Sequence, residues 1–285
     1  VRKADLYRMR FTAKPLIAAL CGHVDINSDL KTRHSLVGNV SDMTVITSEK
    51  AYRPVDISMN IVTNPDTTYA QILSGNMEMD MHSPDGYEKI MAKAQRCMNV
   101  LMKQIKEKVI DQAQLKRALP ELSVYMMSGN ENPFAEIMKY YGITFSDMLL
   151  TFNTSPAQGI NGNGHIYSLN ADSVQLDTLN LTIYEDSAQT KFKGQVKNNK
   201  NNPQFVFNAL FDGYLLKSGA GLDVKYYDAN NKLGAKLGVA AEMVDSGIRM
   251  HLYPDKPVLG YKTFNLNHDN YLMLGNDRRI SANID

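Results

Sequence analysis

Histidine is a common metal ligand, and the six histidines of this chain are scattered along its length. None of them lies three or four residues from another, and the sequence contains no CxxC pair. Structural zinc sites and HExxH helices need spacings of that kind. We therefore expect no metal site and no cofactor. The six are His23, His34, His82, His165, His251 and His268.

Two glycine-rich segments could form phosphate loops or tight turns. Residues 159–164 read GINGNG, lack the GK[ST] ending of a P-loop and precede strand-like sequence. Without a following helix N-terminus such a loop has no anion-binding geometry, so we interpret it as a turn or bulge. Gly219-Ala220-Gly221 is likewise predicted to be a turn. A GxSxG nucleophile elbow is also absent, and these absences favour a protein that is not an enzyme.

Charge and hydropathy exclude further classes. The 285 residues include 31 basic and 30 acidic side chains, a balance that argues against a nucleic-acid partner. No apolar run reaches the roughly 18 residues of a membrane-spanning helix. Cys21 and Cys97 are interpreted as buried thiols, although one disulfide is possible in an oxidising compartment. The length allows one large domain or two small ones.

Residues 1–82 show the period of two that is typical of strands with one buried face. Ile57, Met59 and Ile61 alternate with polar neighbours, and Asn64-Pro65-Asp66 is a turn signal. Leu73 is assigned to the same apolar series as Met77, Met79 and Met81. This segment is therefore predicted to be a run of β-strands.

Residues 83–145 have a helical period and are predicted to form a helical insert. Ser83 and Pro84 suit a helix start, and one amphipathic helix of roughly 30 residues is expected to end at Leu119-Pro120. A second helix is predicted over residues 121–128. A third is predicted from Phe134 to Tyr141, opened by Asn132-Pro133 and closed by Gly142.

The predicted long helix is basic, and methionine is concentrated near it. Residues 83–119 carry eight basic and four acidic side chains, and ten of the 16 methionines lie between Met77 and Met148. The basic side is interpreted as a solvated face, or as a helix that lies near anionic lipid or covers an open end of the sheet. The methionines are interpreted as core filling or as an adaptable apolar groove.

Residues 146–285 return to a period of two, with turn-rich joints and no helical pattern. The predicted fold class is therefore mainly β with a helical insert, an α+β arrangement. Its antiparallel sheet is expected to be curved and elongated, either a trough or a sandwich, with residues 1–82 and 146–285 in one continuous sheet. The alternation is still running over residues 278–285, and the first residue is valine, so we expect a piece of a longer β-rich chain.

The apolar members of the later strands could line a lengthwise groove. An acyl chain gains about 0.8 kcal/mol for each CH₂ removed from water, and it needs no specific polar contact. A closed, dry sandwich core is the alternative interpretation of the same residues. The groove candidates are Phe205, Phe207, Phe211, Leu222, Val224, Leu237, Val239, Ile248, Met250 and Leu252.

Several short strings resemble TamB-type translocation and assembly proteins of the AsmA-like group, from Gram-negative envelopes. They are residues 117–122 (RALPEL), 132–134 (NPF), 246–257, 264–267 and 269–271, and the resemblance covers about residues 80–285. It implies a periplasmic segment of a parent protein anchored in the inner membrane. It also implies a non-enzymatic apolar groove for lipid transfer between membranes and for outer-membrane assembly. The implied partners are phospholipids, neighbouring segments of the same chain and outer-membrane assembly proteins.

A different function class remains open from the residues alone. A surface or periplasmic β-sandwich could bind glycan or another protein, and sugar platforms need exposed aromatic side chains. The chain has no tryptophan and 15 tyrosines. An exposed flat cluster of Tyr226, Tyr227 and Tyr261 would favour this alternative.

Overall fold

The computed structural model describes residues 4–10, 12, 15–47, 51–53, 55–107, 111–186 and 189–285. The chain is 61% strand and 13% helix, which confirms the predicted mainly β class with helices. It forms two compact units. The first comprises residues 1–91, 121–151 and 170–173, and the second comprises residues 92–120, 152–169 and 174–285.

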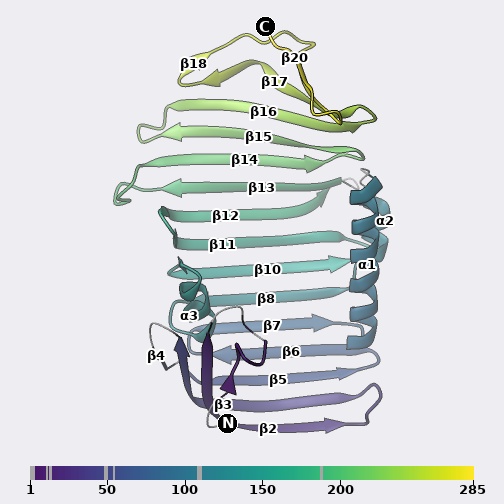
Figure 1. Ribbon diagram of the computed structural model, residues 1–285, viewed down its shortest axis with the longest axis vertical. Helices are drawn as coiled ribbons and strands as arrows, with labels where there is room; N and C mark the ends of the chain where they lie inside the picture. Colours follow the sequence, from purple (N-terminus) through teal and green to yellow (C-terminus); the bar gives the residue numbers. More distant parts are fainter. Residues whose placement is uncertain are drawn as a thin grey trace. The chain divides into compact units, whose positions relative to one another are not determined.

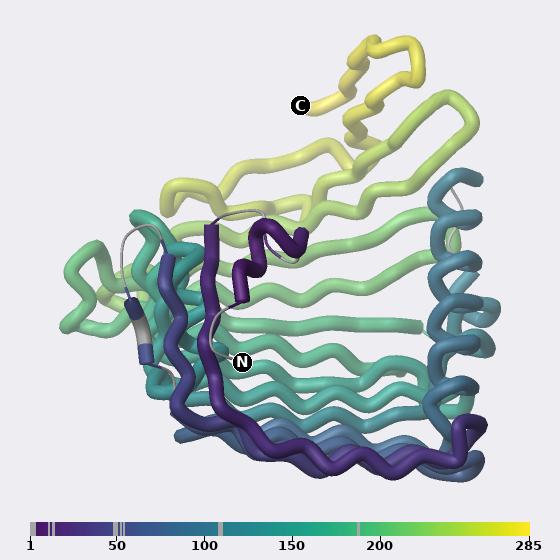
Figure 2. The backbone as a smooth tube through the Cα atoms, turned by 60° about the horizontal axis from the view of Figure 1, so that its bottom comes forward, coloured from purple at the N-terminus to yellow at the C-terminus, as the bar shows by residue number. Residues whose placement is uncertain are grey.

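In the first unit, successive strands pair antiparallel in the order β2, β3, β5, β6, β7, β8. The short β1 pairs with β2, β4 with β3, and β9 with the last two residues of β11. Figure 2 shows β2 and β3 as adjacent purple and dark blue tubes. The bounds are β1 Ala4–Asp5, β2 Leu16–Ser28, β3 His34–Thr47, β4 Ala51–Tyr52, β5 Ile57–Asn64, β6 Thr67–Ser74, β7 Met77–Ser83, β8 Leu122–Gly129 and β9 Ile143–Thr144.

In the second unit, β12 to β17 form an antiparallel meander in which each strand pairs with the next (Figure 1). The strand β17 also pairs with β18 and β19, and β19 pairs with β20. Strands β10 and β11 each have residues in both units. The bounds are β10 Asp147–Ser155, β11 Gly159–Ala171, β12 Val174–Asp186, β13 Gln189–Asn198, β14 Phe207–Leu215, β15 Gly219–Asp228, β16 Leu233–Val244, β17 Gly247–Leu259, β18 Lys262–Thr263, β19 Tyr271–Gly275 and β20 Ile280–Asn283.

The single long helix predicted to end at Leu119 is wrong, because two helices occupy that stretch. They are α1 (Tyr87–Glu107) and α2 (Gln112–Ala118), and residues 108–110 between them lie outside the described part of the chain. Asp111 begins α2 as its N-cap, since its Oδ1 accepts a hydrogen bond from the N–H of Gln114 at 2.9 Å.

The helix predicted over residues 121–128 is wrong, because β8 occupies that stretch and pairs with β7. The helix α3 (Pro133–Tyr140) matches its prediction: Asn132 caps it, and Gly142 follows with a positive φ of 81°. None of the described helices is both long enough and apolar enough to span a bilayer.

Segment 83–145 is not purely helical, since β8 and β9 lie within it. The compact units divide the chain after residues 91, 120, 151, 169 and 173. The division into 1–82, 83–145 and 146–285 stays a prediction. A single continuous sheet that joins 1–82 to 146–285 stays a prediction.

Few hydrophobic side chains are fully covered. Among the described residues, five are buried, namely Ile90, Ala118, Leu119, Ala135 and Phe145. A sealed β-sandwich of this size would bury far more, because its two inner faces cover each other. The strands therefore leave an apolar face accessible instead of enclosing it.

Candidate functional site: an uncovered apolar face

The strand register of the second unit gathers the apolar side chains onto one face. Val224 of β15 lies opposite Phe211 of β14 and Leu237 of β16. Val239 of β16 lies opposite Leu222 of β15 and Leu252 of β17. Directly opposed residues point to the same side of a sheet, so every second residue of these strands shares this side. We call it the apolar face.

Nine of the ten predicted groove residues lie within these strands and on the apolar face. They are Phe207, Phe211, Leu222, Val224, Leu237, Val239, Ile248, Met250 and Leu252. The tenth, Phe205, precedes β14, and its ring stacks on Phe207 with centroids 5.0 Å apart. Phe207 in turn stacks on Tyr226 at 6.0 Å, which extends the apolar face with a row of aromatic rings.

Further members of the apolar face were not among the predicted site residues. They share the period-two pattern, which is the signal that could have identified them. Pairing of β12 to β17 and β19 places each of them on the same side of the sheet as the predicted groove residues. These members are Leu179, Leu181, Ile183, Phe192, Val196, Ala209, Tyr226, Ala235, Ala241, Met243, Leu272 and Leu274.

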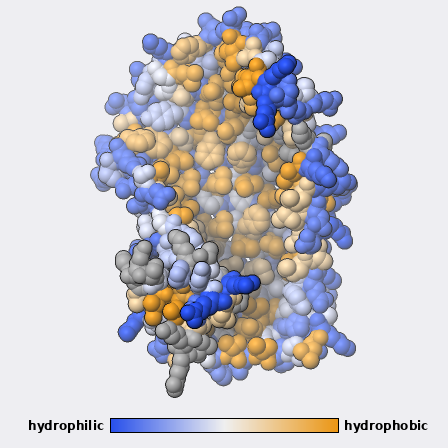
Figure 3. Space-filling view, viewed as in Figure 1, coloured by the Kyte–Doolittle hydropathy of each residue, from blue (hydrophilic) through white to orange (hydrophobic). Residues whose placement is uncertain are grey.

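The apolar face is accessible from outside. Val224 and Leu222, in the middle of the meander, are 37% and 40% exposed, and most of the other members are half-buried. Figure 3 shows hydrophobic residues gathered over β12 to β17, with hydrophilic residues along the margins. A contiguous uncovered patch of this kind marks a binding surface in a folded protein.

Two glycines let aromatic rings lie flat across the apolar face. A Cβ added to Gly213 would lie 2.1 Å from Cζ of Phe192, and a Cβ added to Gly194 would lie 2.1 Å from Cζ of Phe211. Each ring therefore occupies the space above a glycine on the neighbouring strand, as in aromatic rescue of strand glycines. We call these two rings, which bridge β13 and β14, the aromatic floor.

The opposite face of the same strands is polar. It carries Lys191, Lys193 and Lys225, each on the other side from its apolar neighbours. The hydroxyl of Tyr253 donates a hydrogen bond to Asp223 Oδ2 at 3.0 Å. Burial, together with hydrogen bonds to Tyr214 and Asp223, raises the pKa of the Tyr253 phenol above its ordinary value. This face is solvated, so an apolar ligand would bind to the apolar face.

The helix α2 is attached to the ends of β12, β13 and β14. Gln112 Nε2 donates to the carbonyl of Leu215 at 2.9 Å, and Gln112 Oε1 accepts from the N–H of Thr190 at 2.8 Å. Lys116 Nζ lies 3.1 Å from Glu185 Oε1, with side chains 24% and 11% exposed. These contacts satisfy polar groups at the strand ends and leave the middle of the apolar face uncovered.

The first unit shows the same division into faces. Met79 lies opposite Ile72 and Met126, and Ile61 lies opposite Ala70. Leu73 does not belong to this series, which corrects the prediction. The turn at Gly75, with φ of 55°, pairs Ser74 with Met77 and places Leu73 opposite Glu78 on the other side.

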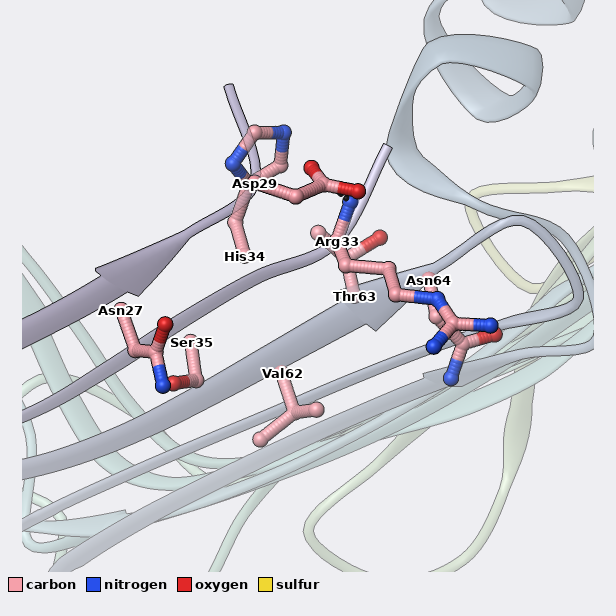
Figure 4. A pocket seen from close by; sticks show the side chains of 8 residues that line it. All are labelled: Asn27, Asp29, Arg33, His34, Ser35, Val62, Thr63 and Asn64. Carbon is pink, nitrogen blue, oxygen red and sulfur yellow. Dashed lines mark hydrogen bonds between the residues drawn. The ribbon is translucent and has the colours of Figure 1, made fainter. Parts of the chain in front are cut away.

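A polar pocket of about 580 Å³ lies in the first unit, where β2 and β5 end and β3 begins (Figure 4). Asp29 Oδ1 accepts the N–H groups of Lys31, Thr32 and Arg33, each at 2.9 Å. These backbone donors lower the pKa of Asp29. His34 Nδ1 lies 2.7 Å from Ser28 Oγ. The polar groups of this pocket thus hold their own turn together. Its lining residues are Asn27, Asp29, Arg33, His34, Ser35, Val62, Thr63 and Asn64.

The cysteines are free thiols, so no disulfide joins them. Cys21 is exposed, which corrects the prediction of a buried thiol there, while Cys97 on α1 is half-buried and burial raises its pKa. Cys21 begins a stretch of β2, residues 21–27, in which every residue is exposed. Within the described part of the chain, no three His, Cys, Asp or Glu side chains gather into a group that could hold a metal ion.

Comparisons with protein-family models, with curated proteins and with solved structures find no match. The resemblance to TamB-type proteins therefore stays a prediction.

Proposed function

We propose that the apolar face of the second unit binds the acyl chains of lipids and that the protein acts without catalysis. One observation carries the proposal: a continuous apolar surface over six successive strands is left uncovered in the folded chain. Such a surface has a strong affinity for apolar ligands because each buried CH₂ contributes about 0.8 kcal/mol.

The chemistry of the apolar face suits an acyl chain better than a compact ligand. Its members are aliphatic and aromatic, and the directional polar groups lie on the opposite face. The hydrophobic effect has no directional requirement, so the surface can accept chains of different length and unsaturation.

The finer proposal follows from the TamB resemblance. In it, the chain is a periplasmic segment of a parent protein anchored in the inner membrane, and it guides phospholipids toward the outer membrane. Neighbouring segments of the same chain and outer-membrane assembly proteins would be its partners. The open apolar face supports this proposal because a conduit needs an uncovered apolar surface, whereas a storage protein encloses its ligand.

Lipid extraction and native mass spectrometry of the purified protein test the proposal. We expect co-purifying or exchangeable phospholipid, and we expect Val224→Asp to lose most of it. The carboxylate would lie between Phe211 and Leu237 on the apolar face.

Lys225→Asp is the matched control, because Lys225 is the next residue along β15 and points to the polar face. It should retain lipid at the level of the unmodified protein. An unmodified protein that binds no lipid, or equal loss of lipid in the two variants, would contradict the proposal.

The glycan-binding or protein-binding alternative receives less support from the geometry. Tyr226 and Tyr227 are neighbours on β15, so they point to opposite faces, and Tyr226 stacks on Phe207 within the apolar face. Tyr261 is hydrogen-bonded to Asp228 near the β15–β16 turn. The three tyrosines do not form the flat exposed platform that this alternative needs.

A further inference from the structure

The part of α1 that belongs to the second unit carries an apolar side that is exposed, with no cover from the segments that the structure describes. Met98, Met102 and Ile105 are 53%, 58% and 62% exposed, and Leu101 lies beside them. Their spacing of three and four residues places them on one side of the helix. We call these four residues the methionine stripe. An amphipathic helix normally turns such a stripe toward the core, and here it is exposed.

A different side of α1 is the one that packs onto the protein. Gln104 is buried, and its Oε1 accepts the N–H of Asp111 at 2.9 Å. Its Nε2 donates to the Asp111 carbonyl at 3.1 Å and to Gln114 Oε1 at 3.0 Å. Cys97 and Val100 are half-buried on this side as well. The helix is therefore fixed along this polar seam, and the exposure of the methionine stripe follows from that attachment.

Positive charge accompanies the methionine stripe. Residues 92–107 contain Lys93, Arg96, Lys103 and Lys106 against the single acid Glu107. Because an α-helix has about 3.6 residues per turn, Lys106 lies at the edge of the methionine stripe next to Met102, whereas Arg96 and Lys103 lie on the polar side of the helix. An exposed apolar stripe on one side of a helix and a polar side rich in lysine and arginine are typical of a helix that lies in the interface of an anionic membrane.

From this combination we infer that α1 docks onto the surface of a bilayer containing anionic phospholipid. The methionine stripe enters the boundary between head groups and acyl chains, Lys106 at its edge contacts the phosphates, and the remaining basic side chains add to the electrostatic attraction. Methionine suits this role because its flexible thioether adapts to disordered lipid. The positive charge identifies the partner, because an uncharged bilayer or a basic protein surface would not complement it. This inference does not depend on acyl-chain binding by the strands.

The absence of tryptophan gives a background-free measurement of docking. Met102→Trp places one fluorescent reporter in the methionine stripe, and Ala92→Trp places one outside it on the same helix. With vesicles of phosphatidylcholine and phosphatidylglycerol, we expect the emission of the Met102→Trp protein to shift to the blue and to be quenched by brominated acyl chains. The emission of the Ala92→Trp protein should change much less. Vesicles of phosphatidylcholine alone should have little effect on either protein.

Charge reversal tests the electrostatic part in the tryptophan-free protein. Lys103→Glu with Lys106→Glu should weaken co-sedimentation with anionic vesicles by roughly tenfold or more. Lys225→Glu with Lys236→Glu makes the same change of net charge on the polar face of β15 and β16, and it should weaken binding far less. Met98→Gln with Ile105→Gln keeps the charge and should also weaken binding.

Three outcomes would overturn the inference. The first is equal binding to charged and uncharged vesicles, and the second is an emission spectrum of the Met102→Trp protein that does not shift with anionic vesicles. The third is an unmodified protein that self-associates, as seen by light scattering, and does not bind vesicles, together with a Met98→Gln and Ile105→Gln variant that is monomeric. That result would assign the methionine stripe to a second copy of the chain. Thermal unfolding of each variant shows whether it remains folded.

Discussion

At the scale of single residues, the aromatic floor depends on the absence of a side chain at two positions. Phe192 lies over Gly213, and Phe211 lies over Gly194. Glycine normally weakens a strand, because it loses more backbone entropy on folding than other residues. Here the cost is offset by the ring that packs against the bare backbone.

We predict that Gly213→Ala destabilises the protein by about 1–3 kcal/mol, because the new methyl group displaces the Phe192 ring. In a Phe192→Leu background the same substitution should cost much less, or stabilise by up to about 1 kcal/mol, since alanine has less backbone entropy to lose. Urea unfolding of the four proteins in this double-mutant cycle measures the coupling. Equal effects of Gly213→Ala in the two backgrounds would show that the ring does not depend on the glycine.

Tyr253 gives a prediction for the effect of pH. Its pKa is raised in the folded state, so the unfolded state releases the phenol proton first, near its ordinary value of 10.0. The contribution of Tyr253 to the free energy of unfolding is therefore fully present below pH 10, and it is lost as the pH rises toward the folded-state pKa. Tyr253→Phe should cost about 1 kcal/mol at neutral pH, because it leaves Asp223 without its 3.0 Å donor. Thermal unfolding at increasing alkaline pH should show a smaller decline for the variant than for the original protein.

The apolar face can be predicted from the sequence because period two is a local signal. Phe207, Phe211, Val224 and Val239 belong to alternating segments, and the pattern requires no knowledge of their partners. The glycine–aromatic contacts cannot be predicted in this way, because they join residues on different strands. Gly221 is the corresponding error: the sequence places it in a turn, yet it lies within β15 beneath the ring of Tyr214.

At the scale of secondary-structure elements, α2 stabilises the strand ends through a partly buried ion pair. Lys116→Met should destabilise the second unit by about 1–3 kcal/mol, because Glu185 is left largely buried without its partner. Adding Glu185→Gln to this variant should recover part of the loss. Lys103→Met removes a partner from the exposed Lys103–Glu107 pair, 3.8 Å apart, and should change stability by less than about 0.5 kcal/mol. Equal losses in the two single variants, measured by urea unfolding, would refute a structural role for the buried pair.

The error at β8 shows where element prediction from sequence fails. Leu122, Val124 and Met126 lie in a region of helical pattern, and the sequence alone favours a helix there. In the structure they alternate along a strand, and Val124 and Met126 lie opposite Met81 and Met79 of β7. A short apolar run fits either element, and the partner strand that decides between them begins more than 40 residues earlier. The helix α3 is predicted correctly because local signals mark its two ends.

At the scale of the whole molecule, the main observation is how few hydrophobic side chains are buried among the described residues. The folded protein should therefore bind the dye ANS without any denaturant. A phospholipid or mild detergent that occupies the apolar face should displace the dye. It should also raise the unfolding temperature, because a ligand at a hundred times its Kd adds about 2.7 kcal/mol to the free energy of unfolding. Val224→Asp should reduce both effects. A protein that binds no dye when folded would contradict the uncovered face.

The meander of the second unit joins each strand from β12 to β17 only to its neighbours in sequence. The chain enters and leaves a β-hairpin at the same end of its two strands. One hairpin can therefore be added or removed without reversing the direction of the strands that remain. In evolution such a chain can lengthen or shorten in steps of two strands. The width of the apolar face then depends on the number of hairpins that the sequence encodes.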